Sequence, residues 1–110
     1  MTEFYILDGT LPKSVDTVQE WAAWFEHNAR HVGKTDVGVL WVSTVFLGID
    51  HSQGYGKPIL FETMIYNNAM KEWMDYQTRC ATWEEAIEMH SKGIDFAERV
   101  LRARKSMFKP

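Results

Sequence analysis

The sequence is poor in cysteine and proline and contains no long hydrophobic run; its 110 residues include one cysteine and three prolines. Cys80 cannot form an intrachain disulfide, and no Cys/His spacing typical of a structural zinc site is present. The fold therefore depends on packing alone, and no metal or cofactor is expected. No apolar stretch approaches the ~20 residues that a membrane helix needs. The first residues have neither a basic start nor an apolar run, so we expect no signal peptide, no membrane partner and a cytoplasmic location.

Charge is distributed unevenly along the chain. It carries 15 acidic and 12 basic residues, a net charge of −3, and residues 99–110 hold five of the bases and no acid. This basic end could contact a phosphate. Cations near a helix C-terminus also offset the helix dipole, and the sequence favours that interpretation. Because the rest of the chain is acidic, nucleic acid ranks low among the expected partners.

Aromatic residues, in contrast, are abundant, with five Trp, four Tyr and six Phe. A chain of this size builds one small core, so some of these rings are expected at a surface where something binds. Hydrophobic patterning leaves four rings outside the predicted core: Trp24, Tyr55, Trp73 and Trp83. We expect Trp24, Trp73 and Trp83 to form an interface, because aromatic residues are favoured anchors at binding surfaces.

The hydrophobic patterns predict a single α+β domain over residues 1–110. Strands are expected at residues 4–7, 37–49, 59–66 and 73–80, and amphipathic helices at residues 17–32 and from residue 82 into the basic end. Residues 10–15, which contain Pro12, are expected to be a connection. The predicted order is β-α-β-β-β-α, a mostly antiparallel sheet of about four strands with both helices packed on it. The segment 37–49 is apolar on both faces, which indicates a central strand covered on both sides.

Both predicted helices begin with a capping-box pattern. Thr17 and Glu20 are three residues apart, as are Thr82 and Glu85. In each pair, the two side chains can satisfy free backbone N–H groups at the start of the helix.

Two residues are unusual on the apolar stripe of the second helix. Gly93 costs roughly 1 kcal/mol relative to Ala in a helix, and we expect it to permit a close approach to the sheet. His90 is interpreted as a core histidine bonded to a backbone carbonyl rather than as a catalytic residue.

The loop at residues 50–58 concentrates groups suited to a ligand. Its glycines let backbone N–H groups approach an anion, Lys57 adds positive charge and Tyr55 offers a stacking face. The predicted ligand-binding residues are Asp50, His51, Gly54, Tyr55, Gly56 and Lys57, together with Arg79. The spacing matches neither a Walker motif nor a dinucleotide fingerprint, and a plain hairpin loop is the alternative interpretation.

Asp50, His51 and Glu62 are weak candidates for catalysis. An acid beside a histidine can perform general acid–base chemistry. Neighbouring residues on a strand point to opposite faces, however, so Asp50 and His51 need an irregular backbone to act together. Glu62 can instead be satisfied by Arg79 or by a backbone group.

Three other reactive side chains receive structural interpretations. Cys80 precedes a helix N-terminus, which can lower a thiol pKa, but a small buried filler is favoured. His27 and His31 lie four residues apart on the first predicted helix. Without a third ligand at a diagnostic spacing they are interpreted as surface residues, and no metal site is expected.

Five segments form a signature: Tyr5–Gly9 (YILDG), Arg30–Val32 (RHV), Val42–His51 (VSTVFLGIDH), Pro58–Met64 (PILFETM) and Thr82–Ala86 (TWEEA). Together with the aromatic first helix, this signature resembles a group of small proteins encoded by phages and prophages, to which no activity is assigned. The resemblance covers most of residues 5–95. It implies a phage accessory protein that acts in the cytoplasm of a bacterial host.

These observations favour a non-enzymatic binding protein. The expected partner is a host protein or a nucleotide-like small molecule, and the phage setting suggests counter-defence, by inhibiting a host factor or sequestering a host signalling nucleotide. One alternative is a small hydrolase or transferase that uses Asp50, His51 and Glu62. Another is a homo-oligomeric assembly protein whose exposed rings are subunit contacts. A homo-oligomer is also compatible with binding, because a ligand site can form between subunits.

Overall fold

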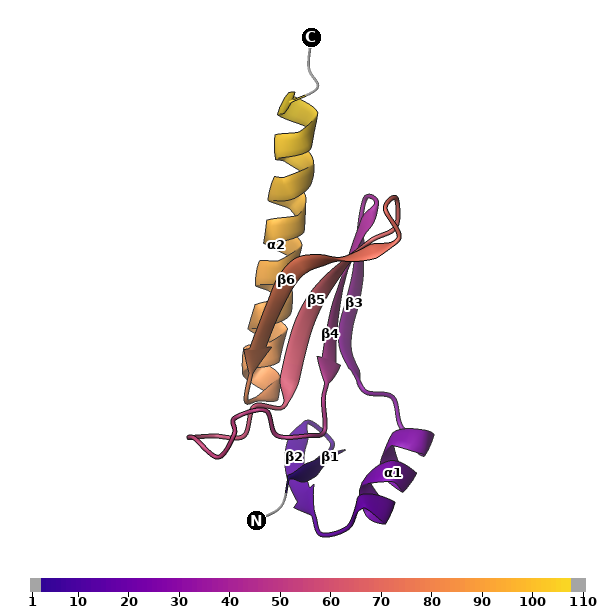
Figure 1. Ribbon diagram of the computed structural model, residues 1–110, viewed down its shortest axis with the longest axis vertical. Coiled ribbons are helices and arrows are strands. Elements are labelled where there is room, and N and C mark those ends of the chain that lie inside the picture. Colours follow the sequence, from indigo (N-terminus) through magenta and orange to yellow (C-terminus); the bar gives the residue numbers. More distant parts are fainter. Residues whose placement is uncertain (1–2, 108–110) are drawn as a thin grey trace.

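The computed structural model describes residues 3–107 and shows an α+β fold of six strands and two helices (Figure 1). The strands are β1 (Phe4–Asp8), β2 (Leu11–Val15), β3 (His31–Val37), β4 (Leu40–Phe46), β5 (Phe61–Asn67) and β6 (Glu72–Cys80). The helices are α1 (Val18–His27) and α2 (Trp83–Met107). The predicted α+β class is confirmed.

The strands form two antiparallel sheets rather than the single predicted one. β1 and β2 form a two-stranded hairpin, and β3, β4, β5 and β6 form a four-stranded sheet in that order. Within the described residues the order is β-β-α-β-β-β-β-α, so the predicted order lacks two strands. The antiparallel pairing across the loop at residues 50–58 is confirmed, because Phe46 pairs with Phe61.

One of the two additional strands is β2, which the sequence analysis treats as a connection because it contains Pro12. Pro12 pairs with Leu7 of β1. A proline cannot donate a hydrogen bond to a ladder, but it is tolerated on an edge strand. Both strands of a two-stranded sheet are edges, so the proline does not prevent pairing.

The other additional strand is β3, part of which the sequence analysis assigns to the first helix. α1 ends at His27 because Asn28 is extended (φ −132°, ψ 144°), and the Asn28 side-chain amide donates to the carbonyl of Trp24. Val32 lies at helical spacing in the sequence, yet residues 31–37 pair with β4. Long-range pairing therefore outweighs the local helical pattern.

The strand predicted at residues 37–49 begins with a tight turn. Val37 pairs with Leu40, so Gly38 and Val39 form a two-residue connection between β3 and β4, and Gly38 has a φ of 59°. Two-residue hairpin turns use positive φ angles, which glycine adopts without steric cost. The β-branched residues on both sides hide this turn in the sequence.

α2 covers one face of the four-stranded sheet (Figure 1). The capping box of α2 is complete: Thr82 Oγ1 accepts from the Glu85 N–H at 3.1 Å, and the Glu85 carboxylate accepts from the Thr82 N–H at 3.1 Å. At α1 the predicted N-cap bond is present, from the Glu20 N–H to Thr17 Oγ1, but Glu20 bonds the Thr17 hydroxyl rather than its N–H. A Cβ on Gly93 would lie 2.9 Å from Cγ1 of Val42, so the predicted close approach is confirmed. The buried side chains of this core are Leu40, Val42, Phe46, Leu60, Phe61, Ile65, Ala86, Met89 and Ala97.

α1 does not pack on the four-stranded sheet, so the prediction that both helices cover it is wrong. None of the α1 residues is fully buried, and the helix lies against the β1–β2 hairpin below the sheet (Figure 1). Trp24 and Phe25 reach the end of β4, where their ring centroids lie 5.8 and 6.1 Å from that of Phe46. Gly48 (φ 75°) contacts the Phe25 ring so closely that no Cβ would fit.

The β1–β2 hairpin is attached to the segment that follows β4. The Tyr5 N–H donates to the Gly48 carbonyl at 2.8 Å, and the Asp50 N–H donates to the Glu3 carbonyl at 3.0 Å. The hairpin and α1 thus form an N-terminal unit at one end of the sheet.

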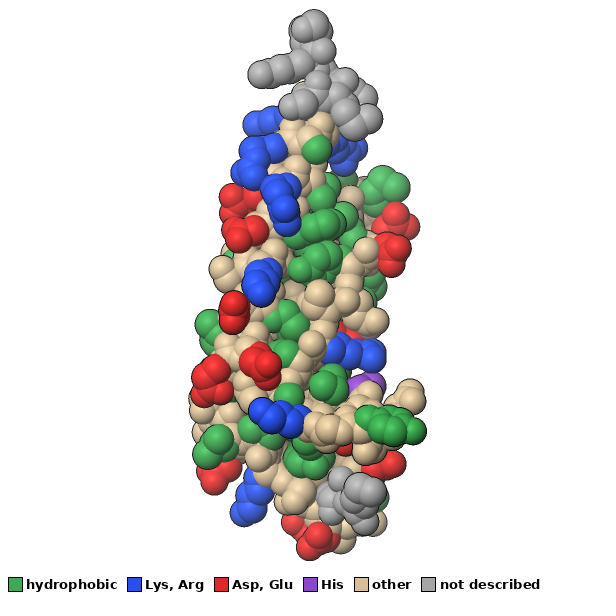
Figure 2. All heavy atoms as spheres, turned by 90° about the vertical axis from the view of Figure 1, so that its left-hand side faces the viewer, with side chains coloured by type: hydrophobic (Ala, Val, Ile, Leu, Met, Phe, Trp, Pro, Cys, Tyr) green, Lys and Arg blue, Asp and Glu red, His purple; other side chains and the backbone are tan. Residues whose placement is uncertain are grey.

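The basic end predicted from the sequence lies on the last turns of α2. Arg99, Arg102, Arg104 and Lys105 are exposed, and Figure 2 shows Lys and Arg side chains gathered over this end of the helix. This position fits cations that offset the helix dipole. Lys109 lies outside the described residues. Within residues 3–107, neither helix combines the length and the apolar character needed to span a bilayer.

Candidate functional site

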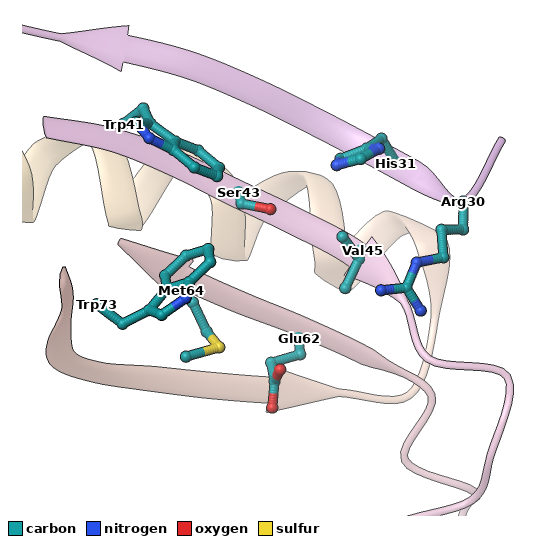
Figure 3. A pocket seen from close by; sticks show the side chains of 8 residues that line it. All are labelled: Arg30, His31, Trp41, Ser43, Val45, Glu62, Met64 and Trp73. Atoms are coloured by element: carbon teal, nitrogen blue, oxygen red, sulfur yellow. The ribbon is translucent and has the colours of Figure 1, made fainter. Parts of the chain in front are cut away.

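The face of the four-stranded sheet opposite α2, here called the open face, has no helix over it in the described part of the chain (Figure 3). Side chains alternate along a strand, so Val42 and Thr44 of β4 face α2 while Trp41 and Val45 face outward, half-buried. The predicted covering of this strand on both sides is therefore wrong, because α1 lies at the end of the sheet.

The strand register arranges the open face in three rows. The aromatic row is Asp36, Trp41, Tyr66 and Trp73; the middle row is Lys34, Ser43, Met64 and Gln77; the charged row is His31, Val45, Glu62 and Arg79. On the central strands β4 and β5, successive rows are two residues apart, which is about 7 Å, whereas the register shifts on β3 and β6. The open face is thus aromatic at one end and charged at the other, about 13 Å away.

Trp41, Tyr66 and Trp73 form an aromatic triad across three strands. Their ring centroids are 5.4 Å (Trp41–Tyr66), 5.2 Å (Trp41–Trp73) and 5.1 Å (Tyr66–Trp73) apart, distances at which tilted and edge-on rings attract. Lys34 Nζ lies 4.5 Å from the Trp41 ring centroid, a cation–π contact that occupies one side of that ring. Trp73 remains 47% exposed, so the triad presents an aromatic surface to solvent.

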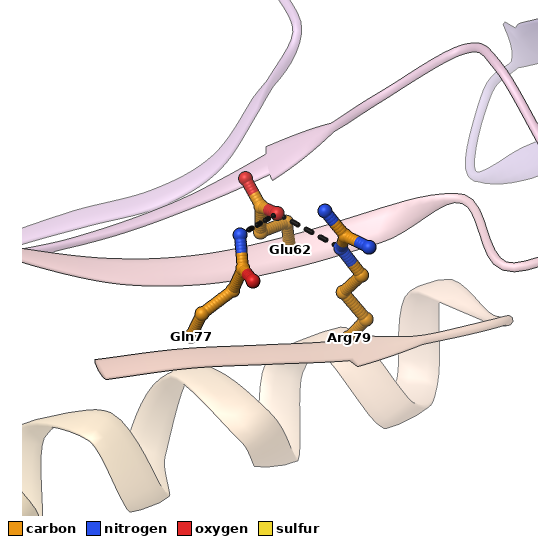
Figure 4. A network of polar contacts seen from close by, with 3 residues as sticks. All are labelled: Glu62, Gln77 and Arg79. Carbon is orange, nitrogen blue, oxygen red and sulfur yellow. Dashed lines mark hydrogen bonds and ion pairs between the residues drawn. The ribbon is translucent and has the colours of Figure 1, made fainter. Parts of the chain in front are cut away.

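Glu62 is a charged group of the open face that two hydrogen bonds fix in orientation. Its Oε2 atom accepts from Arg79 Nε at 2.9 Å and from Gln77 Nε2 at 2.8 Å, and its side chain is only 11% exposed (Figure 4). The predicted Glu62–Arg79 pair is confirmed. Both bonds use the same oxygen, and Figure 4 shows the other carboxylate oxygen pointing away from both partners. That oxygen is a fixed hydrogen-bond acceptor.

A cavity of about 240 Å³ lies between the aromatic and charged ends. It is lined by Arg30, His31, Trp41, Ser43, Val45, Glu62, Met64 and Trp73 (Figure 3). Arg30 precedes β3, and its guanidinium points toward Val45 in Figure 3. Within residues 3–107, Arg30 forms no ion pair; its Cζ atom lies 6.0 Å from the Phe25 ring centroid.

The loop at residues 50–58 is a separate feature that Asp50 holds in shape. The Asp50 carboxylate accepts from the Ser52 N–H (2.8 Å), the Ser52 hydroxyl (2.9 Å) and the Ile59 N–H (3.0 Å). Partial burial by itself would raise the pKa of Asp50, but these three donors outweigh it and lower the pKa. Asp50 therefore closes the loop, and both of its carboxylate oxygens are engaged in doing so.

The other predicted ligand residues of this loop point to solvent. His51, Gly54, Tyr55, Gly56 and Lys57 are exposed, and Tyr55 is 83% exposed. Arg79 lies instead on the open face, so the structure separates it from the loop residues with which it was grouped.

The structure does not join the catalytic candidates into one site. Glu62 is bonded to Gln77 and Arg79, whereas Asp50 is bonded to Ser52 and Ile59. His51 is exposed, and its N–H donates to the Ile59 carbonyl at 3.0 Å. Among residues 3–107, no three His, Cys, Asp or Glu side chains gather as metal ligands would.

His90 lies on the covered side of the sheet. Its Nδ1 is 2.7 Å from Thr44 Oγ1 and its Nε2 is 2.9 Å from Thr35 Oγ1. A packed histidine is found, as predicted, but its partners are threonine hydroxyls instead of a backbone carbonyl. Burial lowers the pKa of His90, which favours the neutral ring.

Of the other reactive side chains, Cys80 and His27 do not line the cavity, whereas His31 does. Burial, together with the charge of Glu85, raises the pKa of the Cys80 thiol to about 11, so the packed thiol is protonated at neutral pH. His27 ends α1 and His31 begins β3, so the predicted spacing of these two histidines on one helix is wrong. His31 lines the charged end of the cavity.

The three tryptophans predicted as an interface have different positions. Trp24 and Trp83 are half-buried and pack against the core, the latter on Phe61 with centroids 6.2 Å apart. Trp73 alone of the three belongs to the open face. Sequence reasoning missed Trp41, Tyr66 and Arg30, although strand alternation groups Trp41 with Ser43 and Val45, and aligning that face with the face of β5 would have joined the triad.

No protein-family model, no curated protein and no solved structure matches this chain. The site is therefore interpreted from its own geometry.

Proposed function

We propose that this chain is a non-enzymatic binding protein that holds a planar ligand, carrying a polar or anionic group, on the open face of its four-stranded sheet. The observation that carries the proposal is the aromatic triad of Trp41, Tyr66 and Trp73, which lies beside a cavity whose far end holds Glu62 and Arg30. A ring would contact the triad, while a polar group would reach the charged row.

Binding is favoured over catalysis by the arrangement of polar groups in the cavity. Ser43 is the only hydroxyl residue among those lining it, and within the described residues no histidine is hydrogen-bonded to Ser43 to act as a base. Glu62 is committed through one oxygen to Arg79 and Gln77. The unbonded Glu62 oxygen is a fixed acceptor, and Arg30 is a cation without an ion-pair partner among residues 3–107. Both suit recognition, because they can orient a ligand without transferring protons.

The resemblance to phage-encoded proteins gives this binding a setting. In that setting, the proposed role is that of a phage accessory protein that holds a host molecule in the bacterial cytoplasm. Binding alone would be enough to inhibit a host factor or to sequester a host signalling nucleotide.

The test is a titration of the full chain, followed by tryptophan fluorescence and calorimetry, against nucleosides, nucleotides, indole and phenyl carboxylates and short aromatic peptides. We expect at least one planar compound to bind saturably. Trp73→Ala should weaken that binding roughly 5- to 150-fold, because stacking on an aromatic side chain contributes about 1–3 kcal/mol.

Tyr55→Ala is the matched control, because Tyr55 is an exposed ring on the loop at residues 50–58 rather than on the open face. It should leave the affinity unchanged while both variants keep the wild-type circular dichroism. Equal affinity of Trp73→Ala and wild type, or a loss confined to Tyr55→Ala, would contradict the proposal.

A further inference from the structure

The geometry points to a ribonucleotide as the ligand of the open face, with its base on the aromatic triad, its ribose hydroxyls on Glu62 and its phosphate at Arg30 and His31. This inference rests on the proposed function and names the ligand class of the same site. The order of the three chemical groups across the sheet carries it.

The aromatic end is built to receive a base. Trp41 and Trp73 lie edge-on to one another, with an interplanar angle of 65°, and both line the cavity above Met64 (Figure 3). Lys34 already occupies one side of Trp41, which fixes that ring. Every nucleobase has a π face, so such a surface binds bases without reading their identity.

Glu62, although it belongs to the charged row, matches a ribose, because Figure 3 shows its carboxylate between the Trp73 ring and the Arg30 guanidinium. Glu62 presents one free carboxylate oxygen, while the other is held by Arg79 and Gln77, so the carboxylate is fixed in orientation. A carboxylate that accepts hydrogen bonds from ribose hydroxyls is a recurrent device of nucleotide-binding sites. Because the bond is charge-assisted, the loss of a hydroxyl should be measurable.

The far end matches a phosphate. Arg30 has no ion-pair partner among residues 3–107, and its planar guanidinium can donate two parallel hydrogen bonds to phosphate oxygens. His31 lies beside it on the same side of the cavity. A ligand must therefore extend from the triad to Arg30, and a base linked through ribose to phosphate presents its groups in that order.

The size of the cavity favours a ligand no larger than a single nucleotide. Its volume of about 240 Å³ lies below the ~300–1,000 Å³ of pockets that enclose drug-sized ligands. The acidic character of residues 1–98 also opposes a long polyanion. A free mononucleotide is accordingly favoured over an RNA chain.

The experiment compares the four ribonucleoside 5′-monophosphates with their 2′-deoxy counterparts and with the unphosphorylated ribonucleosides, by calorimetry on the full chain. We expect the ribonucleotide to bind at least 5-fold more tightly than the deoxynucleotide and at least 10-fold more tightly than the nucleoside. Glu62→Gln should bring the ratio of ribose to deoxyribose affinity close to one. Arg30→Ala should remove the preference for the phosphate and leave nucleoside affinity unchanged.

Glu88→Gln and Arg99→Ala are the matched controls, because both residues are exposed on α2, and both should preserve the wild-type ratios. Equal binding of ribonucleotide and deoxynucleotide, or an unchanged ratio in Glu62→Gln, would overturn the inference. A 5′-phosphorylated oligoribonucleotide that binds more tightly than the mononucleotide would overturn the assignment to a free nucleotide. If indole or phenyl carboxylates bind through Trp73 and nucleotides do not, the inference fails while the proposed function stands.

Discussion

His90 of α2 is joined to Thr44 of β4 across the helix–sheet interface, with 2.7 Å between Nδ1 and Oγ1. Thr44 is also hydrogen-bonded to Thr63 of β5, and Thr63 pairs in register with Thr78 of β6. A line of polar side chains therefore crosses the buried face of the sheet beneath the helix. A neutral imidazole offers one donor and one acceptor nitrogen to the hydroxyls of Thr44 and Thr35, which is why the charge state of His90 matters for stability.

Lowering the pH below about 6.5 should destabilise the protein through His90. Burial lowers the pKa of His90 in the folded state, so below the ordinary histidine pKa of 6.5 the unfolded chain binds the proton more readily. The contribution of His90 is thus fully present above that pH and is lost as the pH falls through the folded-state pKa. Urea unfolding between pH 7.5 and 5 would measure it. The His90→Gln variant should show a shallower dependence, and an identical slope would contradict the prediction.

Gly93→Ala should lower the free energy of unfolding by about 1 kcal/mol, although alanine is the better helix former by a similar amount. The new methyl group would lie 2.9 Å from Val42 Cγ1 and 3.1 Å from Thr63 Cγ2, so the helix must move from the sheet. Thermal unfolding would show the change. Ser91→Ala, at an exposed position of the same helix, should be neutral or slightly stabilising, and a Gly93→Ala variant more stable than wild type would refute the packing argument.

α2 illustrates what the sequence could predict. Its capping box at Thr82 and Glu85, its apolar stripe and the close approach at Gly93 all depend on local spacing, and the structure contains each of them. The strands β5 and β6 also lie within two residues of their predicted ends, because turn-forming residues such as Asn67 bound them; Asn67 Oδ1 accepts from the Ala69 and Met70 N–H groups.

The segment from Asn28 to Leu40 shows why the rest could not be predicted. Local spacing continues the first helix to Val32, and only the pairing with β4 makes residues 31–37 a strand. That error also hid the open face. Two helices and one predicted sheet suggest that the helices cover both faces of that sheet. No sequence pattern indicates that α1 lies against the β1–β2 hairpin instead. Trp41 was consequently assigned to a covered face instead of to a binding surface.

Asp50→Ala should loosen the loop at residues 50–58 and lower the free energy of unfolding by about 1–2 kcal/mol, because three hydrogen bonds lose their acceptor. Faster amide hydrogen exchange at Ile59 would locate the effect, and ligand affinity on the open face should remain unchanged. Asp50→Asn keeps one acceptor oxygen and should be milder. Equal stability of Asp50→Ala and wild type would contradict the role given to this carboxylate.

Cys80 should react slowly with alkylating reagents. With a pKa of about 11, only a small fraction of the thiol is ionised at pH 8. We expect iodoacetamide to modify the folded protein on the order of 100-fold more slowly than the urea-unfolded chain. Mass spectrometry would report this site alone, since the chain has a single cysteine. Similar rates in the two states would indicate an accessible thiolate.

The attachment of the N-terminal unit has a consequence for motion. α1 has no fully buried residue. Among residues 3–107, the unit is attached by backbone bonds to the segment after β4, such as that from Tyr5 to Gly48, and by the packing of Trp24 and Phe25 on Phe46. The four-stranded sheet and α2 contain most of the buried apolar side chains, so they can persist while the unit detaches. Residues 4–27 should therefore open as one cooperative block at a lower free energy than global unfolding, a sub-global step that exposes the Phe46 end of the sheet.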